Sequence, residues 1–168
     1  MQSTYREKMI YVNQFMIHKE MPSELRMKIR RYLDYVFESK KEVKVDEHDV
    51  FRLLNDGLRD KIKMHLRGRI LRKIYFIEDF GLDFLSDLTQ FFKKITYVTD
   101  DYLFMEKDKS ESIFYIIEGK VAMIHKQSHT FITDLTKEKY FGEYGFLRGK
   151  PRQLSAKARD FTEVFVIQ

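Results

Sequence analysis

One short segment of the sequence combines residue types that together can bind a phosphorylated ligand. Residues 142–146 are expected to form a short helix after a strand end, and Gly142 allows the backbone to approach a ligand closely. The free N–H groups and the dipole of a helix N-terminus attract anions. Arg152, preceded by a rigid Pro151, can grip a phosphate with two parallel hydrogen bonds. Glu143 then fits a sugar hydroxyl, so the segment predicts a pocket for a phosphorylated sugar.

These residues alone leave a second interpretation open, in which Gly142 forms an ordinary turn and Glu143 makes a surface salt bridge to Arg152. Other chemistry finds little support in the sequence. The absence of Cys excludes disulfides, thiol catalysis and Cys-ligated metals, and the five His residues lack the spacing of a helical zinc site. No Walker loop, nucleophile elbow or dinucleotide-binding turn occurs. We therefore predict a protein that is not an enzyme and has no metal site.

The chain that must position this segment divides into two parts with different spacing of apolar residues. Up to about residue 92 the apolar residues recur at helical spacing. We expect a helix ending near His18 with Tyr5, Met9, Val12 and Met16 on one face, and a second helix after Pro22 with Leu25, Ile29, Leu33 and Val36 buried. A capping pair at Asp46 and Asp49 predicts a short third helix. Further helices are expected from Leu58 to Leu66, after Gly68, and over residues 82–92.

From Ile95 onward the pattern changes to short strands separated by polar turns every 8 to 12 residues, which is typical of an antiparallel sandwich or barrel. The fold class is therefore α+β, an N-terminal α-helical region followed by an antiparallel, jelly-roll-like β-roll with one short helix near Gly142. The expected strands are residues 95–98, 102–105, 113–117, 121–125, 130–135, 154–157 and 164–167.

The excess positive charge lies in the first half of the chain. Residues 1–80 carry 18 basic and 13 acidic side chains, whereas residues 81–168 carry 13 of each, so the whole net charge of +5 precedes the strands. Residues 59–73 hold seven cations and one acid. Such a basic cluster is typical of a site for nucleic acid, an anionic membrane surface or an acidic protein, and as often of a solvated helix face with no dedicated partner. No apolar run is long enough to span a membrane, and we expect no signal peptide.

Residues 141–143 (Phe-Gly-Glu) with Arg152, Ser155 and Ala158 resemble the phosphate-binding cassette of cyclic-nucleotide-binding domains, and residues 114–121 resemble that domain's glycine-terminated central strand. The resemblance implies that Arg152 neutralises the cyclic phosphate and Glu143 accepts the ribose 2′-hydroxyl. It also places Met123 near the purine. The implied ligand is cAMP or cGMP, with no cofactor. The predicted ligand-binding residues are Gly142, Glu143, Tyr144, Gly145, Arg152, Gln153 and Met123.

The cassette departs from the family pattern at two positions. Gln153 stands where the family usually has Thr or Ser, and Leu154 stands where it has Ala. The hydroxyl that helps to hold the phosphate is lost, although the Gln amide can still donate, and the larger Leu154 could crowd the cassette. The sequence therefore leaves open a vacant or self-filled pocket. Two turns also lack the family's glycine, at residues 99–101 and 106–107.

Residues 21–32 and 54–59 resemble the helical linker between the pore and the nucleotide domain of hyperpolarisation-activated, cyclic-nucleotide-gated and related potassium channels. The implied domains are a linker at 1–76 and a nucleotide-binding roll at 77–168, without the lid helix that the family places after its last strand. The implied protein is the soluble, cytoplasmic gating part of a membrane channel, tetrameric through the linker, with the pore as its partner. A nucleic-acid-binding regulator is disfavoured, because that class places its helix-turn-helix after the roll.

Overall fold

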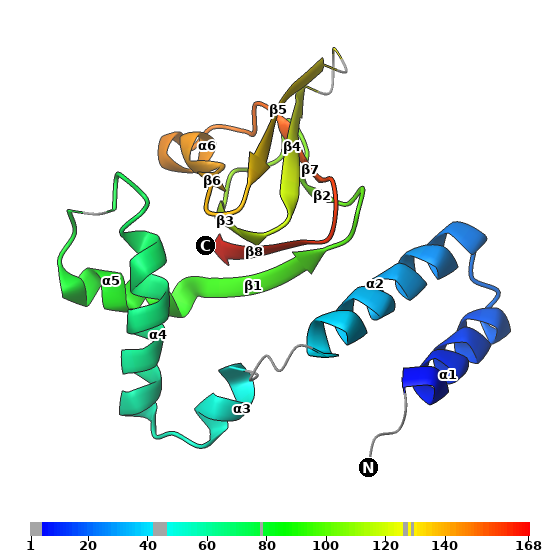
Figure 1. The fold of residues 1–168 in the computed structure, drawn as a ribbon. Helices are drawn as coiled ribbons and strands as arrows, with labels where there is room; N and C mark the ends of the chain where they lie inside the picture. The colour runs from blue at the N-terminus through cyan, green and yellow to red at the C-terminus, as the bar shows by residue number, and fades with distance from the viewer. Residues whose placement is uncertain (1–4, 42–46, 78, 126–127, 129) are drawn as a thin grey trace. The chain divides into compact units, whose positions relative to one another are not determined.

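The computed structural model describes residues 5–41, 47–77, 79–125, 128 and 130–168, and the chain divides into two compact units, residues 1–46 and 47–168 (Figure 1). Each unit is considered by itself below.

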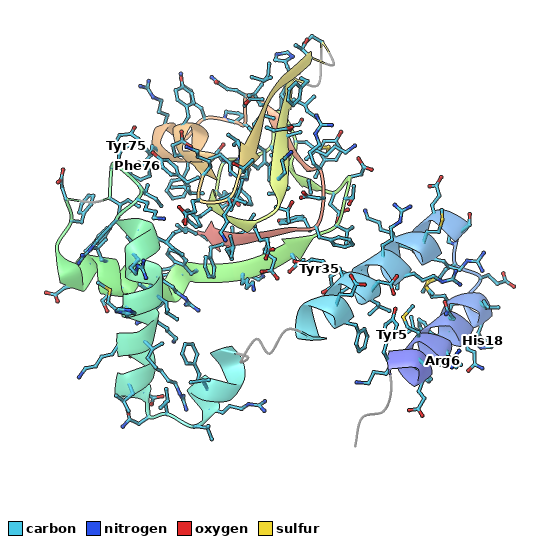
Figure 2. All side chains as sticks on the ribbon, viewed as in Figure 1. Tyr5, Arg6, His18, Tyr35, Tyr75 and Phe76 are labelled. Carbon is cyan, nitrogen blue, oxygen red and sulfur yellow. The ribbon has the colours of Figure 1, made fainter. Side chains whose placement is uncertain are left out.

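The first unit is a hairpin of two helices, α1 (Tyr5–His18) and α2 (Ser23–Lys41). The chain reverses just before Pro22, whose carbonyl accepts the first bond of α2 from the Arg26 N–H. The Tyr5 hydroxyl donates to Asp34, and its ring packs edge-on against Phe37 with 4.6 Å between centroids. Figure 2 labels Tyr5 on the face of α1 that turns towards α2. The two helices are therefore held along their length by polar and aromatic contacts.

The apolar stripe predicted for α1 is the more buried side of that helix. Met16 is 1% exposed, whereas Tyr11 on the opposite side is 73% exposed. In α2 the prediction is only partly correct, because Leu25 is 45% exposed while Ile29, Leu33 and Val36 are half-buried. A two-helix unit has too little interior to cover a full stripe on both helices.

The second unit begins with α3 (Glu47–Arg52) and α4 (Asp56–Leu71). The side chain of Asn55 caps α4 by accepting from the Leu58 N–H at 2.9 Å. The short third helix is thus present, although its predicted cap Asp46 lies outside the described residues. The separate helix predicted after Gly68 is wrong, because α4 continues through Gly68 to Leu71. The residues that follow form turns, and then α5 (Leu82–Leu88) and the 3₁₀ turn η1 (Thr89–Phe91) lead into the first strand.

Within the described residues, eight strands form two four-stranded antiparallel sheets. One sheet has the order β1-β8-β3-β6 and the other β2-β7-β4-β5. The strands are β1 (Phe92–Tyr97), β2 (Tyr102–Phe104), β3 (Ile113–Glu118), β4 (Lys120–His125), β5 (Thr130–Thr136), β6 (Tyr140–Phe141), β7 (Ser155–Ala158) and β8 (Thr162–Ile167). The short helix α6 (Glu143–Arg148) interrupts them between β6 and β7. The predicted α+β fold with a jelly-roll-like β-roll is confirmed, and β6 is the strand that the sequence did not predict.

Two apolar cores hold this unit together. The first lies between the sheets and consists of Phe104, Phe114, Ile116, Val121, Phe141, Ala156, Val164 and Val166. The second joins the end of α4, the following turns and α5 to the roll, and consists of Leu71, Ile74, Ile77, Leu85, Phe92, Ile113 and Ile167. The end of α4 and α5 are therefore part of the same packed body as the strands. The boundary between the two compact units lies near residue 46. The boundary expected at residue 76, between a linker and a nucleotide-binding roll, stays a prediction.

The two turns that lack the family's glycine keep a glycine-like backbone. Asp100 has φ of 72° and Lys107 has φ of 75°, in the left-handed region. Asp101 supports the first turn by accepting from the Val98 N–H, and Asp108 supports the second by accepting from the Met105 N–H. Within the described parts of the chain, no helix is both long enough and apolar enough to cross a membrane.

Candidate functional site

Gly142 links β6 to α6 in a conformation that only glycine adopts readily. Its φ is 87°, and a Cβ added to it would lie 2.6 Å from the Nη1 atom of Arg152. The carbonyl oxygen of Gly142 accepts a hydrogen bond from that Nη1 at 2.7 Å. Gly142 therefore gives the arginine both the space and the acceptor that fix its position.

The short helix α6 rests on the loop before β3. A Cβ on Gly145 would lie 2.2 Å from Ser110 Oγ and 2.8 Å from the Lys150 carbonyl oxygen, so only glycine allows this close approach. No side chain caps the start of α6. On its outer side the guanidinium of Arg148 lies over the ring of Tyr144 at 5.1 Å. The first turn of the helix thus offers backbone N–H groups that no side chain covers.

Arg152 is the most unusual residue of the site, because its charged side chain is buried. The residue is 5% exposed. Nη2 donates to the Ser112 carbonyl oxygen at 2.6 Å, and the guanidinium lies over the Phe104 ring at 4.3 Å. Nε has no hydrogen-bond partner. Burial lowers the pKa of Arg152 from its usual value, and the carboxylates of Asp108 and Glu143 oppose that shift.

The alternative surface salt bridge between Glu143 and Arg152 is wrong. Among the described residues no ion pair within 4.0 Å joins Arg152 to any carboxylate. The guanidinium instead sits against two neutral carbonyl groups and an aromatic ring. A buried cation without a paired anion is unfavourable in itself, and here two carbonyl hydrogen bonds and an aromatic ring offset part of that cost.

The seven residues predicted for the site come together around one pocket of about 220 Å³. They come from β4, the start of α6 and the segment before β7. Gln153 is exposed and Leu154 is half-buried, so Leu154 narrows the pocket without filling it. The pocket is lined by Phe104, Met123, Phe141, Gly142, Glu143, Tyr144, Gly145, Arg152, Gln153 and Leu154.

Sequence reasoning missed two residues that shape this site. Phe104 carries the guanidinium on its ring, and Ser112 accepts from it, but they lie 48 and 40 positions before Arg152 in the chain. No local motif connects them to the cassette. The available signal is that Phe104 lies in a strand that the sequence predicts, and that Ser112 directly precedes another. In the described part of the chain no group of three His, Asp or Glu side chains could hold a metal ion.

Comparison with known proteins gives one domain and a set of relatives. Residues 94–168 match the family described as "Cyclic nucleotide-binding domain". The chain is 24% identical over 169 residues to the human (Homo sapiens) "Cyclic nucleotide-gated channel alpha-3", covering 97% of this chain and 24% of that protein. It is also 24% identical to the "Cyclic nucleotide-gated channel rod photoreceptor subunit alpha" of Gallus gallus, covering 97% and 26%.

The "Cyclic nucleotide-gated channel alpha-2" of Bos taurus is likewise 24% identical, over 97% of this chain and 25% of its own length. The chain thus spans about a quarter of the length of the curated relatives it matches. Its C-terminal part is a cyclic nucleotide-binding domain with homology to cyclic nucleotide-gated channels. The match describes a ligand-binding module and not an enzyme, as predicted.

Proposed function

We propose that this chain is a regulatory module of a cation channel, in which binding of cAMP or cGMP to the β-roll is passed through the N-terminal helices to a pore. The observation that carries the proposal is the buried guanidinium of Arg152, which has no carboxylate within ion-pair distance among the described residues and forms part of the pocket wall. A cyclic phosphate would supply an anionic acceptor for this guanidinium, which the carboxylates of Asp108 and Glu143 influence only from beyond ion-pair distance.

Each predicted residue has a distinct role in this proposal. Arg152 binds the cyclic phosphate, and the backbone N–H groups of Gly142, Tyr144 and Gly145 complete the phosphate cradle at the start of α6. Glu143 accepts a hydrogen bond from the ribose 2′-hydroxyl, since an ionised carboxylate is an acceptor only. These roles are the ones that the resemblance to cyclic-nucleotide-binding domains implies, and the contact between Arg152 and Gly142 supports them, because it places the cation next to the start of α6.

The opposite part of the pocket wall is proposed to face the base. Met123 on β4 lies half-buried against the core between the sheets, where its flexible side chain can pack on a purine ring. Gln153 is proposed to donate its amide N–H to the phosphate, in place of the hydroxyl that the family usually has there.

The channel part of the proposal rests on the extent of the similarity. The relatives called cyclic nucleotide-gated channels match 97% of the chain, and the helices before the roll are included. The core that joins α4 to β3 and β8 gives α4 a direct packing contact with the strands. We infer a cytoplasmic location beneath the membrane, assembly as a tetramer through residues 1–76, the pore as partner, and potassium among the conducted ions.

A second candidate function is a ligand-independent coupling or assembly domain with the same fold. Gln153 and Leu154 favour it, because the first removes the cassette hydroxyl and the second adds bulk to the pocket. In that case the pocket would stay vacant and only the helices would act on the pore.

Isothermal titration calorimetry with cAMP and cGMP separates the two candidates. We expect binding heat from the 168-residue protein, and loss of that heat in Arg152→Gln, which keeps hydrogen-bond donors but removes the charge. Arg31→Gln is the matched control, because Arg31 lies exposed on α2. Absence of heat at millimolar nucleotide, or equal heat from Arg152→Gln and the parent protein, would rule out the ligand-binding proposal.

A further inference from the structure

The buried side chain of Arg152 is held by three residues from different parts of the roll, which we call the arginine seat: Phe104, Ser112 and Gly142. Phe104 supports the face of the guanidinium at 4.3 Å. The carbonyl oxygens of Gly142 and Ser112 accept from Nη1 and Nη2 at 2.7 and 2.6 Å. The seat therefore fixes both the plane and the rotation of the guanidinium.

The groups of the arginine seat that contact the guanidinium carry no formal charge. A ring face and two peptide carbonyls stabilise a cation by partial charges only. Among the described residues, the side chain with a polar atom in hydrogen-bond contact with the guanidinium is that of Ser112, whose Oγ lies 3.3 Å from Nη2. Ser112 is itself 9% exposed, so water competes little at this position. A neutral hydroxyl thus occupies the place from which a carboxylate would pair with the arginine.

The arginine seat does not accept a hydrogen bond from every nitrogen of the guanidinium. It uses the two terminal nitrogens, whereas Nε is buried without a partner. A buried donor without an acceptor costs free energy until an acceptor arrives. In the part of the chain that the structure describes, Arg152 thus has no carboxylate within ion-pair distance and one buried donor without a partner, and its charge is left to more distant carboxylates and to a ligand.

We propose that Phe104 and Ser112 are positioning residues for ligand binding, and that the neutrality of Ser112 is what keeps the pocket open to a cyclic phosphate. The inference rests on the proposed function, since it assigns these residues to the same site. A carboxylate at position 112 would neutralise Arg152 from within the protein. It would act as a built-in competitor of the ligand phosphate.

Ser112→Asp tests this directly, with Ser112→Asn as a neutral control of the same shape. We expect Ser112→Asp to weaken cyclic nucleotide binding by at least about tenfold, since charge-assisted bonds to Arg152 are then satisfied internally. We expect Ser112→Asn to stay within about threefold of the parent protein, since a neutral side chain leaves the charge available. Calorimetric titration at fixed ionic strength gives both values.

Thermal unfolding supplies a second readout that needs no nucleotide. Ser112→Asp is expected to raise the Tm of the parent protein, because it pairs a buried cation, and to lower it in the Arg152→Gln background, because the new carboxylate is then buried alone. A residue that only fills space would shift the Tm in the same direction in both backgrounds.

The outcomes separate this inference from the proposed function. Weaker binding together with opposite Tm shifts supports the seat. Parental affinity in Ser112→Asp, or equal Tm losses in both backgrounds, overturns it. If the parent protein gives no nucleotide heat, the proposed function fails, and the sign of the two Tm shifts still decides whether position 112 controls the charge of Arg152.

Phe104 is tested by Phe104→Leu, which keeps an apolar side chain but removes the ring face, with Phe104→Tyr as the conservative rescue. We expect weaker nucleotide binding in Phe104→Leu, recovery in Phe104→Tyr, and no further loss when Phe104→Leu is added to Arg152→Gln. An additional loss in that double variant would show that the ring acts on the ligand independently of the arginine, and would overturn the positioning role.

Discussion

At the scale of single residues, Gly142 is the position where we expect a change of backbone geometry to affect ligand binding most directly. Gly142→Ala places a Cβ 2.6 Å from Arg152 Nη1 at a φ of 87°. We expect a stability loss of about 1–3 kcal/mol and weaker nucleotide binding, because the guanidinium must leave its seat. Chemical denaturation and calorimetry measure the two effects.

The matched control for this change is Gly57→Ala. Gly57 lies in the first turn of α4, and a Cβ there would come no closer than 3.8 Å to any atom outside its neighbours. Because alanine is the better helix former, Gly57→Ala is expected to be neutral or stabilising by up to about 1 kcal/mol. Similar losses from both variants would contradict the explanation given for Gly142.

Lys107 carries backbone strain that glycine would remove. Its φ of 75° is unfavourable for a residue with a Cβ, so Lys107→Gly is expected to stabilise the protein by up to about 1 kcal/mol. Lys109→Gly in the same loop is the control, and is expected to destabilise, because glycine there only adds freedom to the unfolded chain. Urea denaturation of both variants checks the opposite signs, and a loss of stability in Lys107→Gly would contradict the strain argument.

The residues of the pocket were predictable where their signal is local. The glycine, carboxylate and arginine of the cassette lie within eleven consecutive positions, and the sequence alone indicates an anion site there. The burial of Arg152 could not be predicted in this way, since it depends on Phe104 and Ser112 from distant strands. The surface salt bridge was the simpler expectation because it required no tertiary contact.

At the scale of elements, the strands followed their apolar alternation closely, while helix breaks were harder to predict. Gly68 was expected to end a helix, yet α4 runs through it. A glycine inside a helix costs only about 1 kcal/mol, which tertiary packing can offset. Here Gly68 and Leu71 are buried, and Leu71 belongs to the core that joins α4 to the roll. The two-residue strand β6 carried no periodic signal at all, because its pairing with β3 defines it.

An ion pair connects the end of α4 to the turn before β6. Lys73 Nζ lies 2.9 Å from Glu138 Oε2, and the hydrogen bond from Lys73 lowers the pKa of Glu138. Because the folded-state pKa is depressed, this pair stabilises the fold above the usual Glu pKa of 4.5, and the contribution is lost as the pH falls through the lowered value. We expect Tm to decrease less between pH 6 and pH 3 in Glu138→Gln than in the parent protein.

Lys73→Met provides the control for that pH dependence. Without the ammonium group the pKa of Glu138 should return towards its usual value, so Glu138→Gln should then alter the pH profile far less. An equal change in both backgrounds would assign the acid sensitivity to other carboxylates. Because both side chains are largely exposed, the effect should also shrink at high salt.

At the scale of the whole molecule, the basic cluster at residues 59–73 is in part neutralised by the protein itself. Arg59 pairs with Asp56, Lys63 pairs with Asp60, and Lys73 pairs with Glu138. Arg67 donates to the Thr89 carbonyl oxygen. More than half of the seven cations thus have a partner within the described residues. Three of these partners are carboxylates and one is a neutral carbonyl, so the protein itself neutralises part of the cluster, which composition alone could not show.

Aromatic contacts connect β6, which leads into the pocket, to the segment that follows α4. Tyr140 lies two residues before Gly142, and its ring centroid is 6.5 Å from those of both Tyr75 and Phe76, which follow α4. Figure 2 labels Tyr75 and Phe76 together beside the roll, near α6. We propose that a ligand that orders Gly142 also affects β6, which packs through Tyr140 against the segment after α4.

Hydrogen–deuterium exchange tests that path. We expect cAMP or cGMP to slow exchange in residues 141–154, because the ligand orders the cassette, and also in residues 66–77, because Tyr140 transmits the order to the end of α4. In Tyr140→Leu, which removes the aromatic contacts and keeps an apolar side chain, protection of residues 141–154 should remain while that of 66–77 is reduced. Protection confined to the cassette in the parent protein would show that binding is not coupled to α4, whereas equal protection of 66–77 in Tyr140→Leu would assign the coupling to the apolar core formed by Leu71, Ile74 and Ile113.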